Sequence, residues 1–325
     1  MILDSLAVLA GLVLLFFGGD LLVRGSVRLA ARMGVSPLFV GLVLVGFGTS
    51  APELFASIEA VRVGAPAIAW GNVVGSNLAN TLLILGLAAA VAPFAVDPGP
   101  LWRDGGFGLA AAILLTLAAA VAGVPLWAGI VLLVILLVYL TYAYLQERNV
   151  AVETGIGDKA AGLEMIDPDI RPDGEEPLWK EIAYTVGGLV LIIVGGNLLV
   201  GGARELALFL GMSETVVGLT IVAIGTSAPE LATSIVAARK GEGGIAFGNV
   251  LGSNIYNILA IGGTTAVLAP GSLPPEMIRV ELPLLIGAAV LLIVFARSGF
   301  RFQRWEGVLM TGLYAAYLWW AVAIA

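Results

Sequence analysis

The chain contains no cysteine and no histidine, and only 12% of its 325 residues are charged. Without cysteine there is no disulfide framework and no thiolate nucleophile. Without histidine, the commonest general base and the commonest transition-metal ligand are both missing. Ligand chemistry in this protein therefore depends on the oxygen atoms of carboxylates, amides, hydroxyls and the backbone.

Hydrophobic residues are abundant and make up 59% of the chain. A soluble globular domain is about a quarter charged and nearer half apolar, so this composition indicates an integral membrane protein. The first apolar run continues through Leu22 without the basic leader or cleavage site of a signal peptide. It therefore predicts a retained transmembrane helix.

The net charge of −7 is concentrated in one segment. Residues 147–181 contain ten acidic and four basic side chains, which accounts for −6 of the total. We interpret this segment as a solvated linker between two halves, residues 1–146 and 182–325. A calcium-sensing loop is the alternative, but the segment has no spaced EF-hand-like pattern of oxygen ligands.

Ten segments are long and apolar enough to cross a bilayer, which takes roughly 20 residues. They are residues 4–23, 36–61, 67–92, 106–122, 126–146, 183–203, 214–238, 244–267, 281–297 and 306–325. The second, third, seventh and eighth are rich in Gly, Ser, Thr and Asn, so we expect them inside the bundle. The sequence thus predicts an all-α, multi-pass protein of a prokaryotic plasma membrane.

The basic residues indicate an orientation for these spans. If the N-terminus lies outside, all but three of the 16 Lys and Arg fall in cytoplasmic segments, and the exceptions are Arg62, Arg204 and Arg279. Cytoplasmic loops carry an excess of Lys and Arg. Both termini are therefore predicted outside, and the linker inside.

The chain repeats itself with a shift of 177 residues. Gly11 to Pro93 then lies over Gly188 to Pro270 without a gap, and GTSAPEL and GNVVGSNLAN meet GTSAPEL and GNVLGSNIYN. Each half holds five spans, an odd number, so the second copy must enter the membrane the opposite way up. Inverted repeats with a midplane site between the halves are an architecture of secondary transporters.

The first GTSAPEL places polar groups in an apolar span. On a helix, Thr49, Ser50 and Glu53 share one face, and Pro52 lacks the N–H that would bond the carbonyl of Gly48. We expect the helix to bend or unwind there and its freed carbonyls to bind a cation. In the second copy the same roles fall to Thr226, Ser227, Pro229, Glu230 and the backbone of residues 223–225.

The companion motif adds further oxygens. Ser76 and Asn80 lie four residues apart and share a face, while Asn72 and Asn77 either add oxygens or bond a neighbouring helix. The second copy offers Asn249, Ser253, Asn254 and Asn257. Oxygen-only sets of this kind suit hard cations such as Ca²⁺.

Structural interpretations compete with these functional ones. A single GTSAPEL could be a kinked helix whose glutamate reaches an interface, although two copies make this weaker. Gly71/Gly75 and Gly248/Gly252 have the spacing of close helix packing. For Asp20 we favour an ion pair with Arg24 or an interfacial position over a transport role. Three other glutamates lie near span ends, where we expect them to be wetted: Glu59, Glu205 and Glu214.

The paired GTSAPE and GN-x-x-GSN segments resemble the alpha repeats of the cation/calcium exchanger superfamily, in its prokaryotic sodium/calcium exchanger branch. The resemblance covers both halves and nearly the whole chain. It implies ten helices, a midplane cluster of four cation sites and alternating access, with Na⁺ and Ca²⁺ competing for overlapping sites. It also implies that the first and sixth spans are gating helices that slide over the other eight.

The same resemblance implies ligands residue by residue. Glu53 and Glu230 are the central Ca²⁺ ligands, joined by Thr49 and Thr226. Other implied cation ligands are Ser50, Ser76, Asn80, Ser227, Ser253, Asn257 and the carbonyls of Gly46 and Ala223. No cofactor and no nucleic acid is implied, and the partners are Ca²⁺, Na⁺ and the lipid bilayer.

One position departs from the family pattern. Sodium/calcium members carry an aspartate where this chain has Asn257, so both halves have asparagine, at 80 and 257. Two carboxylates match one Ca²⁺, whereas three Na⁺ would leave one surplus positive charge. Na⁺/Ca²⁺ exchange is the favoured function, and H⁺/Ca²⁺ antiport on the same scaffold is the alternative.

An intramembrane enzyme is the rival from another class. An aspartyl protease needs two facing aspartates, and only Asp20 lies near a span. A serine protease would need a histidine or lysine base, and the spans offer neither. A channel is also disfavoured, because inverted halves around a charged midplane suit alternating access better than an open pore.

Overall fold

The computed structural model describes residues 2–33, 35–153, 177–210 and 227–324. Within these ranges eight helical segments are long and apolar enough to cross a membrane. They are Ile2–Ala30, Leu38–Arg62, Pro66–Val91, Leu101–Val121, Leu126–Glu147, Leu178–Ala203, Gly243–Leu268 and Met277–Arg297. The predicted span 214–238 lies partly outside the described residues, and the predicted span 306–325 coincides with helix α18.

Several spans consist of α-helical pieces joined by π-helical ones (labelled η). The first half comprises α1 (Ile2–Met33), α2 (Pro37–Val40), η1 (Gly41–Val45), α3 (Gly46–Arg62), α4 (Pro66–Leu78), η2 (Ala79–Ile84), α5 (Leu85–Val91), α6 (Pro98–Pro100), η3 (Leu101–Gly105), α7 (Gly106–Ala122) and α8 (Leu126–Glu153). The second comprises α10 (Leu178–Phe209), α13 (Ala228–Arg239), α14 (Gly243–Tyr256), η5 (Asn257–Ile261), α15 (Gly262–Leu268), α16 (Pro275–Arg279), α17 (Glu281–Arg297) and α18 (Arg304–Ile324).

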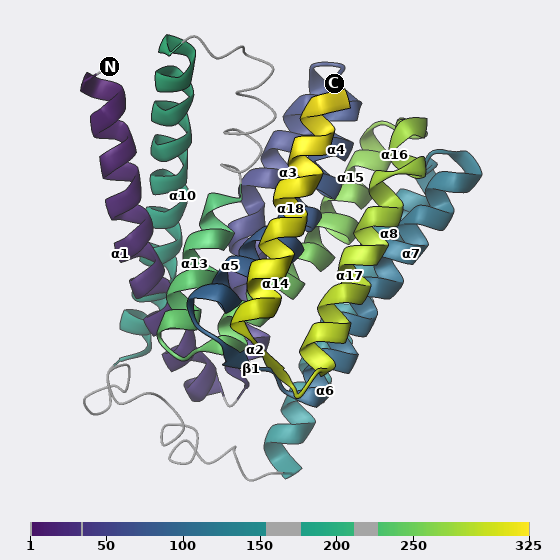
Figure 1. The fold of residues 1–325 in the computed structure, drawn as a ribbon. Helices are drawn as coiled ribbons and strands as arrows, with labels where there is room; N and C mark the ends of the chain where they lie inside the picture. The colour runs from purple at the N-terminus through teal and green to yellow at the C-terminus, as the bar shows by residue number, and fades with distance from the viewer. Residues whose placement is uncertain (1, 34, 154–176, 211–226, 325) are drawn as a thin grey trace.

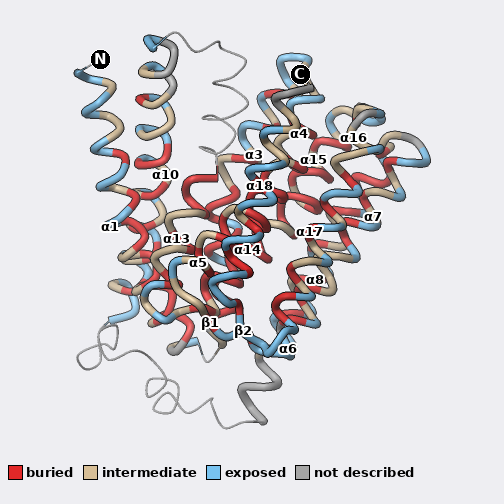
Figure 2. Tube along the Cα trace, viewed as in Figure 1, coloured by how far each residue is buried: buried red, intermediate tan, exposed pale blue. Residues whose placement is uncertain are grey.

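Three of the four spans that the sequence predicts to be internal lie inside the bundle, and the fourth, 214–238, lies partly outside the described residues. In the spans that contain α3, α4 and α14, 61%, 78% and 83% of the most apolar window is buried, whereas the outer spans bury 28–33%. Figure 2 shows this contrast as buried central segments surrounded by helices with exposed outer faces. An inner helix meets protein on all sides, so it can carry polar side chains without exposing them to lipid.

Helices α1 and α10 form a closely packed pair at one flank of the molecule (Figure 1). Glycines allow this approach, because a Cβ at Gly18 would lie 2.9 Å from the carbonyl oxygen of Gly188. A Cβ at Gly195 would likewise lie 2.9 Å from the carbonyl oxygen of Gly11. Small residues let membrane helices approach until their backbones touch. Helices α1 and α10 therefore pack closely along their length.

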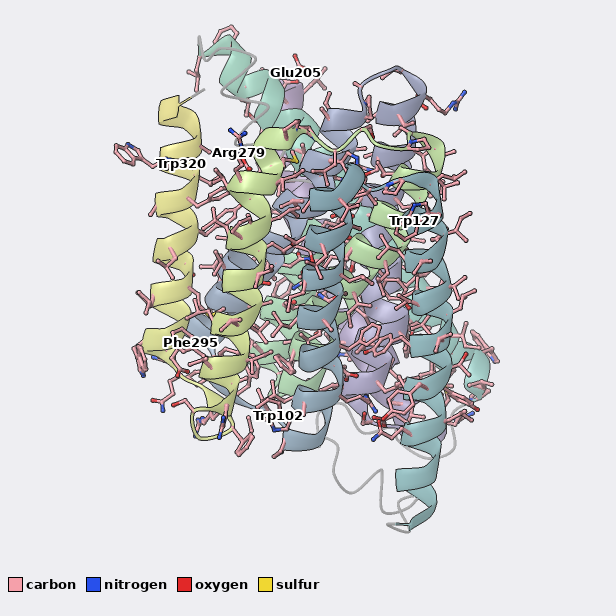
Figure 3. All side chains as sticks on the ribbon, turned by 90° about the vertical axis from the view of Figure 1, so that its right-hand side faces the viewer. Trp102, Trp127, Glu205, Arg279, Phe295 and Trp320 are labelled. Atoms are coloured by element: carbon pink, nitrogen blue, oxygen red, sulfur yellow. The ribbon has the colours of Figure 1, made fainter. Side chains whose placement is uncertain are left out.

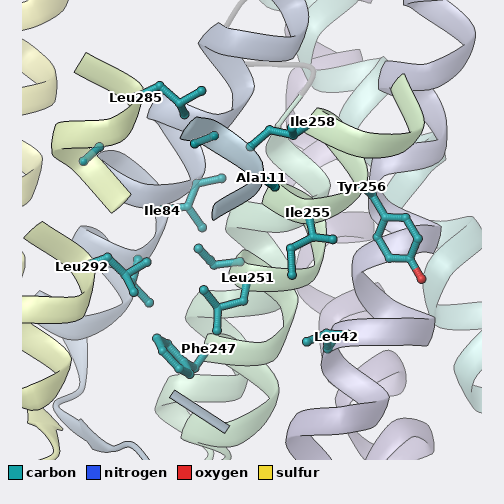
Figure 4. Close-up of a cluster of buried hydrophobic side chains, with 14 of the residues drawn as sticks. Leu42, Ile84, Ala111, Phe247, Leu251, Ile255, Tyr256, Ile258, Leu285 and Leu292 are labelled. Carbon is teal, nitrogen blue, oxygen red and sulfur yellow. The ribbon is translucent and has the colours of Figure 1, made fainter. Parts of the chain in front are cut away.

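Apolar packing holds the centre of the bundle around α14 (Figure 4). Phe247, Leu251 and Ile255 are buried on this helix, and Leu42 of η1 is buried against them. Gly248 and Gly252 have no room for a Cβ, because the backbone of α2 and η1 at Leu38 and Leu42 approaches them. The packing role predicted for this glycine pair is confirmed. At the other pair, a Cβ on Gly71 would meet the end of Met277 at 3.6 Å and one on Gly75 would meet no described residue within 4 Å, so the packing role predicted there stays a prediction.

Polar and aromatic side chains mark the two ends of the bundle. Figure 3 places Glu205, Arg279, Trp127 and Trp320 towards one end and Trp102 at the other. Trp102 and Trp127 are 50% and 62% exposed, and tryptophans of this kind sit at membrane–water interfaces. Glu59 and Glu205 are exposed, as predicted for glutamates near span ends, while Glu214 lies outside the described residues.

Three boundaries differ from the predicted ones. The fourth span starts at Leu101 rather than 106, because η3 continues directly into α7. Helix α8 runs to Glu153 and α10 begins at Leu178, so helices extend into both ends of the predicted linker. A two-stranded antiparallel pair, β1 (Phe94–Ala95) with β2 (Arg301–Phe302), adds a small sheet that the all-α prediction lacks.

Candidate cation-binding site

The first GTSAPEL motif lies on α3, directly after the π-helical segment η1. Pro52 is accommodated inside α3, and the irregular backbone is found at 41–45, where the N–H of Gly46 bonds the carbonyl of Gly41. The predicted unwinding at Gly48 is therefore wrong in position. A wider π turn before the motif relieves the helix, and π turns occur frequently at functional sites.

The glutamates of the two motifs meet in the interior. Glu53 and Glu230 are 1% and 0% exposed, although they lie in different halves of the chain. The hydroxyl of Ser50, on the same helix as Glu53, donates to Oε1 of Glu230 at 3.4 Å, so the two motifs are in direct contact. The interface alternative for these glutamates is wrong, because neither reaches solvent.

Much of the oxygen around these carboxylates has no protein partner. Within the described residues, no hydrogen bond reaches either oxygen of Glu53, Oε2 of Glu230 or Oγ of Ser227. The amide groups of Asn80 and Asn257 also have no partner in the described part of the chain, and both residues are 0% exposed. A buried polar group without a partner costs about 1–3 kcal/mol. These groups lie on elements that pack against one another, α3 on η5 and α13 on η2, and such a set of buried oxygens fits a site that binds cations.

Hydroxyl groups from both halves join around the carbonyl of Gly46. Thr49 Oγ1 donates to this carbonyl at 3.4 Å, and Ser253 Oγ reaches it at 3.3 Å. Thr49 also lies 3.2 Å from Oδ1 of Asn249. The structure therefore brings Gly46, Thr49 and Ser253 together with Asn249, one of the side chains offered by the second companion motif.

The asparagines at 80 and 257 mark the start of π-helical segments in both halves. In η2 the N–H of Leu85 bonds the carbonyl of Asn80, and in η5 the N–H of Gly262 bonds the carbonyl of Asn257. Each bond spans five residues. The 177-residue repeat is thus retained in the irregular backbone as well as in the sequence, at the level where the buried amides lie.

The remaining predicted ligands are placed as follows. Ser76 is buried, and its hydroxyl donates to Oδ1 of Asn72 at 3.3 Å. Ser227 is 2% exposed at the start of α13, where Pro229 occupies the first turn of the helix. Ala223 and Thr226 lie outside the described residues. Across the described ranges, no group of three or more Asp, Glu, His or Cys gathers that could hold a metal, which agrees with a two-carboxylate site.

Two ionic clusters outside this site were missed or only partly found from the sequence. Asp20 pairs with Arg24 at 2.8 Å, as expected, and also with Lys240 at the end of α13. Arg103 joins two carboxylates, Asp104 at 2.6 Å and Glu147 at 3.1 Å. Asp104 is a buried acidic residue near the end of a span, and the sequence offered no signal that Arg103 would pair with Glu147, 44 residues away.

Comparisons with known proteins place the chain in a family. A family model described as "Sodium/calcium exchanger protein" matches residues 5–145 and 180–323. The sodium/calcium exchanger MaX1 of Methanosarcina acetivorans is 36% identical over 340 residues, covering 97% of each chain. The inner membrane protein YrbG of Escherichia coli is 35% identical over 335 residues, covering 98% of each.

A solved structure supports the same assignment. The sodium-calcium exchanger NCX_Mj, soaked without Na⁺ and Ca²⁺, superposes with a TM-score of 0.81 at 32% identity and covers 97% of both chains. A crystal of the same exchanger soaked with 2.5 mM Na⁺ and 1 mM Sr²⁺ gives a TM-score of 0.81 over 98% of both. With the family model matching both halves around a buried oxygen-rich site, the chain belongs to the sodium/calcium exchanger family.

Proposed function

We propose that the protein is a secondary active transporter that exchanges Na⁺ for Ca²⁺ at one shared site between its two halves. The observation that carries the proposal is the burial of Glu53 and Glu230 in contacting motifs, with three of their four carboxylate oxygens accepting no hydrogen bond from the described residues. Ca²⁺ takes six to eight oxygen ligands, and carboxylates are the strongest of these. Amides, hydroxyls and the Gly46 carbonyl would complete the set.

Repulsion between the two carboxylates explains how the site would exchange one ion for another. Two buried carboxylates repel each other and are costly to keep ionised in the membrane. A bound Ca²⁺ or bound Na⁺ ions neutralise them, so the protein would close around the site only when it is loaded. Because the two ions compete for the same oxygens, inward movement of one would drive outward movement of the other.

We propose alternating access of the two halves around this site, with α1 and α10 as the moving pair. Their close packing on each other, at one flank of the buried core, supports this. An arrangement of ten spans in two inverted repeats is supported by Figure 1, where the start of α1 and the end of α18 lie at one end of the bundle and α8 ends at the other. The distribution of Lys and Arg favours termini outside the cell.

The test is ⁴⁵Ca²⁺ uptake into proteoliposomes with imposed Na⁺, K⁺ or H⁺ gradients in separate experiments. Na⁺ loaded inside should drive uptake, and K⁺ loaded inside should not. Uptake driven by a pH gradient but not by Na⁺ would replace the proposal with H⁺/Ca²⁺ antiport, which the asparagine at 257 keeps as the second candidate. No Ca²⁺ uptake under any gradient would overturn the proposed function.

A further inference from the structure

Each half of the chain contains the same contact between two neighbouring helices, and the transport proposal does not use it. Asn72 of α4 donates from Nδ2 to the carbonyl of Glu53 at 3.0 Å and to Oγ of Ser57 at 2.9 Å. Asn249 of α14 donates from Nδ2 to the carbonyl of Glu230 at 3.3 Å and to Oγ of Ser234 at 3.0 Å. In both copies the partners lie 19 and 15 residues earlier in the chain.

These bonds use the full donor capacity of each amide. An asparagine NH₂ group has two N–H donors, and both point to acceptors one helical turn apart on the neighbouring helix. One of the two acceptors is the main chain of the glutamate itself. The amide therefore fixes the backbone at Glu53 or Glu230 without touching the carboxylate.

The consequence for the carboxylates is direct. A carboxylate that accepted N–H donors would have to release them before it could bind a cation, and the lost bonds would subtract from affinity. Here neither oxygen of Glu53 and only Oε1 of Glu230 accepts a hydrogen bond within the described residues. Anchoring through the main chain holds the ligand in place and leaves its oxygens available.

Pro52 makes such an anchor necessary. It has no N–H for the carbonyl of Gly48, so α3 lacks one of its own bonds immediately before Glu53. A lateral bond to the Glu53 carbonyl restrains the helix just after this weak point. Pro229 also directly precedes Glu230, but it lies in the first turn of α13 and removes no bond of that helix; Asn249 supplies the corresponding bond to the Glu230 carbonyl.

We propose that Asn72 and Asn249 are positioning residues for cation binding, each holding the glutamate of its own half through the main chain. This inference rests on the proposed function. Partners that orient a metal ligand typically contribute about 10- to 100-fold in affinity. Removal of either amide should therefore weaken Ca²⁺ binding through the glutamate, without removing any of the cation ligands that the family resemblance implies.

The experiment compares Asn72→Ala and Asn249→Ala with Asn77→Ala. Asn77 is a buried asparagine on α4 that donates to the carbonyl of Val73 in its own helix at 2.7 Å and does not bond α3. Two quantities are measured in the full chain: the apparent KM for ⁴⁵Ca²⁺ in proteoliposomes, and the Ca²⁺ concentration that half-maximally raises the melting temperature in detergent.

Both concentrations should rise by about tenfold or more in the two test variants and stay near wild type in Asn77→Ala. The maximal rate at saturating Ca²⁺ should change by less than about threefold, because the ligands remain. Ser57→Ala keeps the bond to the Glu53 carbonyl and should give a smaller rise than Asn72→Ala. If the alanine variants do not insert, Asn72→Leu and Asn249→Leu, which keep the volume, replace them.

If these hydrogen bonds only stabilise the packing of two helices, the variants should give a different result. The substitutions would lower the melting temperature without Ca²⁺ and the amount of folded protein, and leave both Ca²⁺ concentrations unchanged. That result, in variants of a wild-type protein that transports Ca²⁺, would overturn this inference alone. Absence of Ca²⁺ transport and of Ca²⁺-dependent stabilisation in the wild type would instead overturn the proposed function.

Discussion

The two halves of the chain match at the level of the buried glutamates. In the first half Asn72 bonds the backbone of Glu53, and a π-helical segment starts beside Asn80. In the second half Asn249 bonds the backbone of Glu230, and a π-helical segment starts at Asn257. Away from this level the halves differ. Asp20 of α1 pairs with Lys240 at the end of α13, whereas the positions 177 residues away hold exposed Asn197 and Val63, which cannot form an ion pair.

The difference shows where the repeat carries the function. The features that both halves retain lie at the buried level where Glu53 and Glu230 meet. The Asp20–Lys240 contact, which joins the halves and has no counterpart, lies at the end of α13, where it can bias one arrangement of the helices over another. Substitutions made in pairs, one in each half, separate these two kinds of feature.

The largest effect is expected from Glu53→Gln and Glu230→Gln. Each removes a buried charged ligand and keeps the shape, and breaking a buried charge pair costs about 3–5 kcal/mol, or more than about 100-fold in affinity. Ca²⁺ flux should fall to background in both variants. Glu59→Gln is the matched control, because Glu59 is on the same helix with a 63% exposed side chain; its flux should match wild type.

Equal loss in the two glutamine variants would support a site shared by the halves. Full flux in one of them, with loss in the other, would show that the two halves are not equivalent and would confine the site to one half. The protein yield and the melting temperature without Ca²⁺ should stay close to wild type in both, since the glutamate side chain makes no bond in one case and one in the other.

A second pair, Asn80→Asp and Asn257→Asp, adds a third carboxylate at corresponding places in the two halves. Both amides are buried with no partner among the described residues, and their segments pack on the glutamate helices (η5 on α3, η2 on α13), so we expect the new charge to lie near the same carboxylates in each variant. We expect the pH dependence of Ca²⁺ flux to become steeper and to move to higher pH, by roughly tenfold in proton concentration for each 1.4 kcal/mol of added repulsion. Flux measured across pH in each variant checks this, and an unchanged profile in both would place the amides away from the ions.

The pH dependence of the wild type follows from the carboxylates. Only a deprotonated glutamate coordinates a cation, so protons compete with Ca²⁺ and the apparent KM for Ca²⁺ should rise as the pH falls. The rise should reach at most about tenfold per pH unit for each displaced proton. Because the competition is mutual, high Ca²⁺ should restore the rate at low pH; a loss that high Ca²⁺ does not restore would point to damage elsewhere.

The smallest effect is expected at the ion pair of α1. Asp20, Arg24 and Lys240 are partly exposed, and such pairs contribute about 0.2–1 kcal/mol, or at most about fivefold in a rate. Asp20→Asn makes α1 resemble α10 at this position and should change the exchange rate within that range, with the KM for Ca²⁺ unchanged. Lys240→Met should give the same change, and the double variant no more; additive effects would show that the two residues act independently.

Much of the site could be predicted from the sequence because it is built from two local motifs that repeat. The spacing within GTSAPEL and GNVVGSN fixes which side chains share a helix face, and the 177-residue shift identifies their counterparts. The position of the backbone irregularity could not be predicted in the same way. Pro52 indicates that a bond is missing at Gly48, but the neighbouring helices decide where the helix widens, and this happens at 41–45.

The ionic contacts between distant segments could also not be predicted from the sequence. Asp20 and Lys240 are separated by 220 residues, and nothing in either local sequence indicates the other. Arg103 and Asp104 appeared to precede a span, so their burial with Tyr139 and Glu147 was not expected. The role of Asn72 and Asn249 is intermediate: the sequence indicates a polar contact, and only the packing of α3 on α4 and of α13 on α14 identifies its partner.

The most direct test of the central claim is anomalous X-ray scattering from crystals of the protein soaked in Sr²⁺, a heavier substitute for Ca²⁺. The account predicts one strong peak in the bundle interior, within coordination distance of carboxylate oxygens from both Glu53 and Glu230, and no such peak in Glu53→Gln crystals. A peak bound to only one of the two glutamates, or none between them at saturating Sr²⁺, would contradict it.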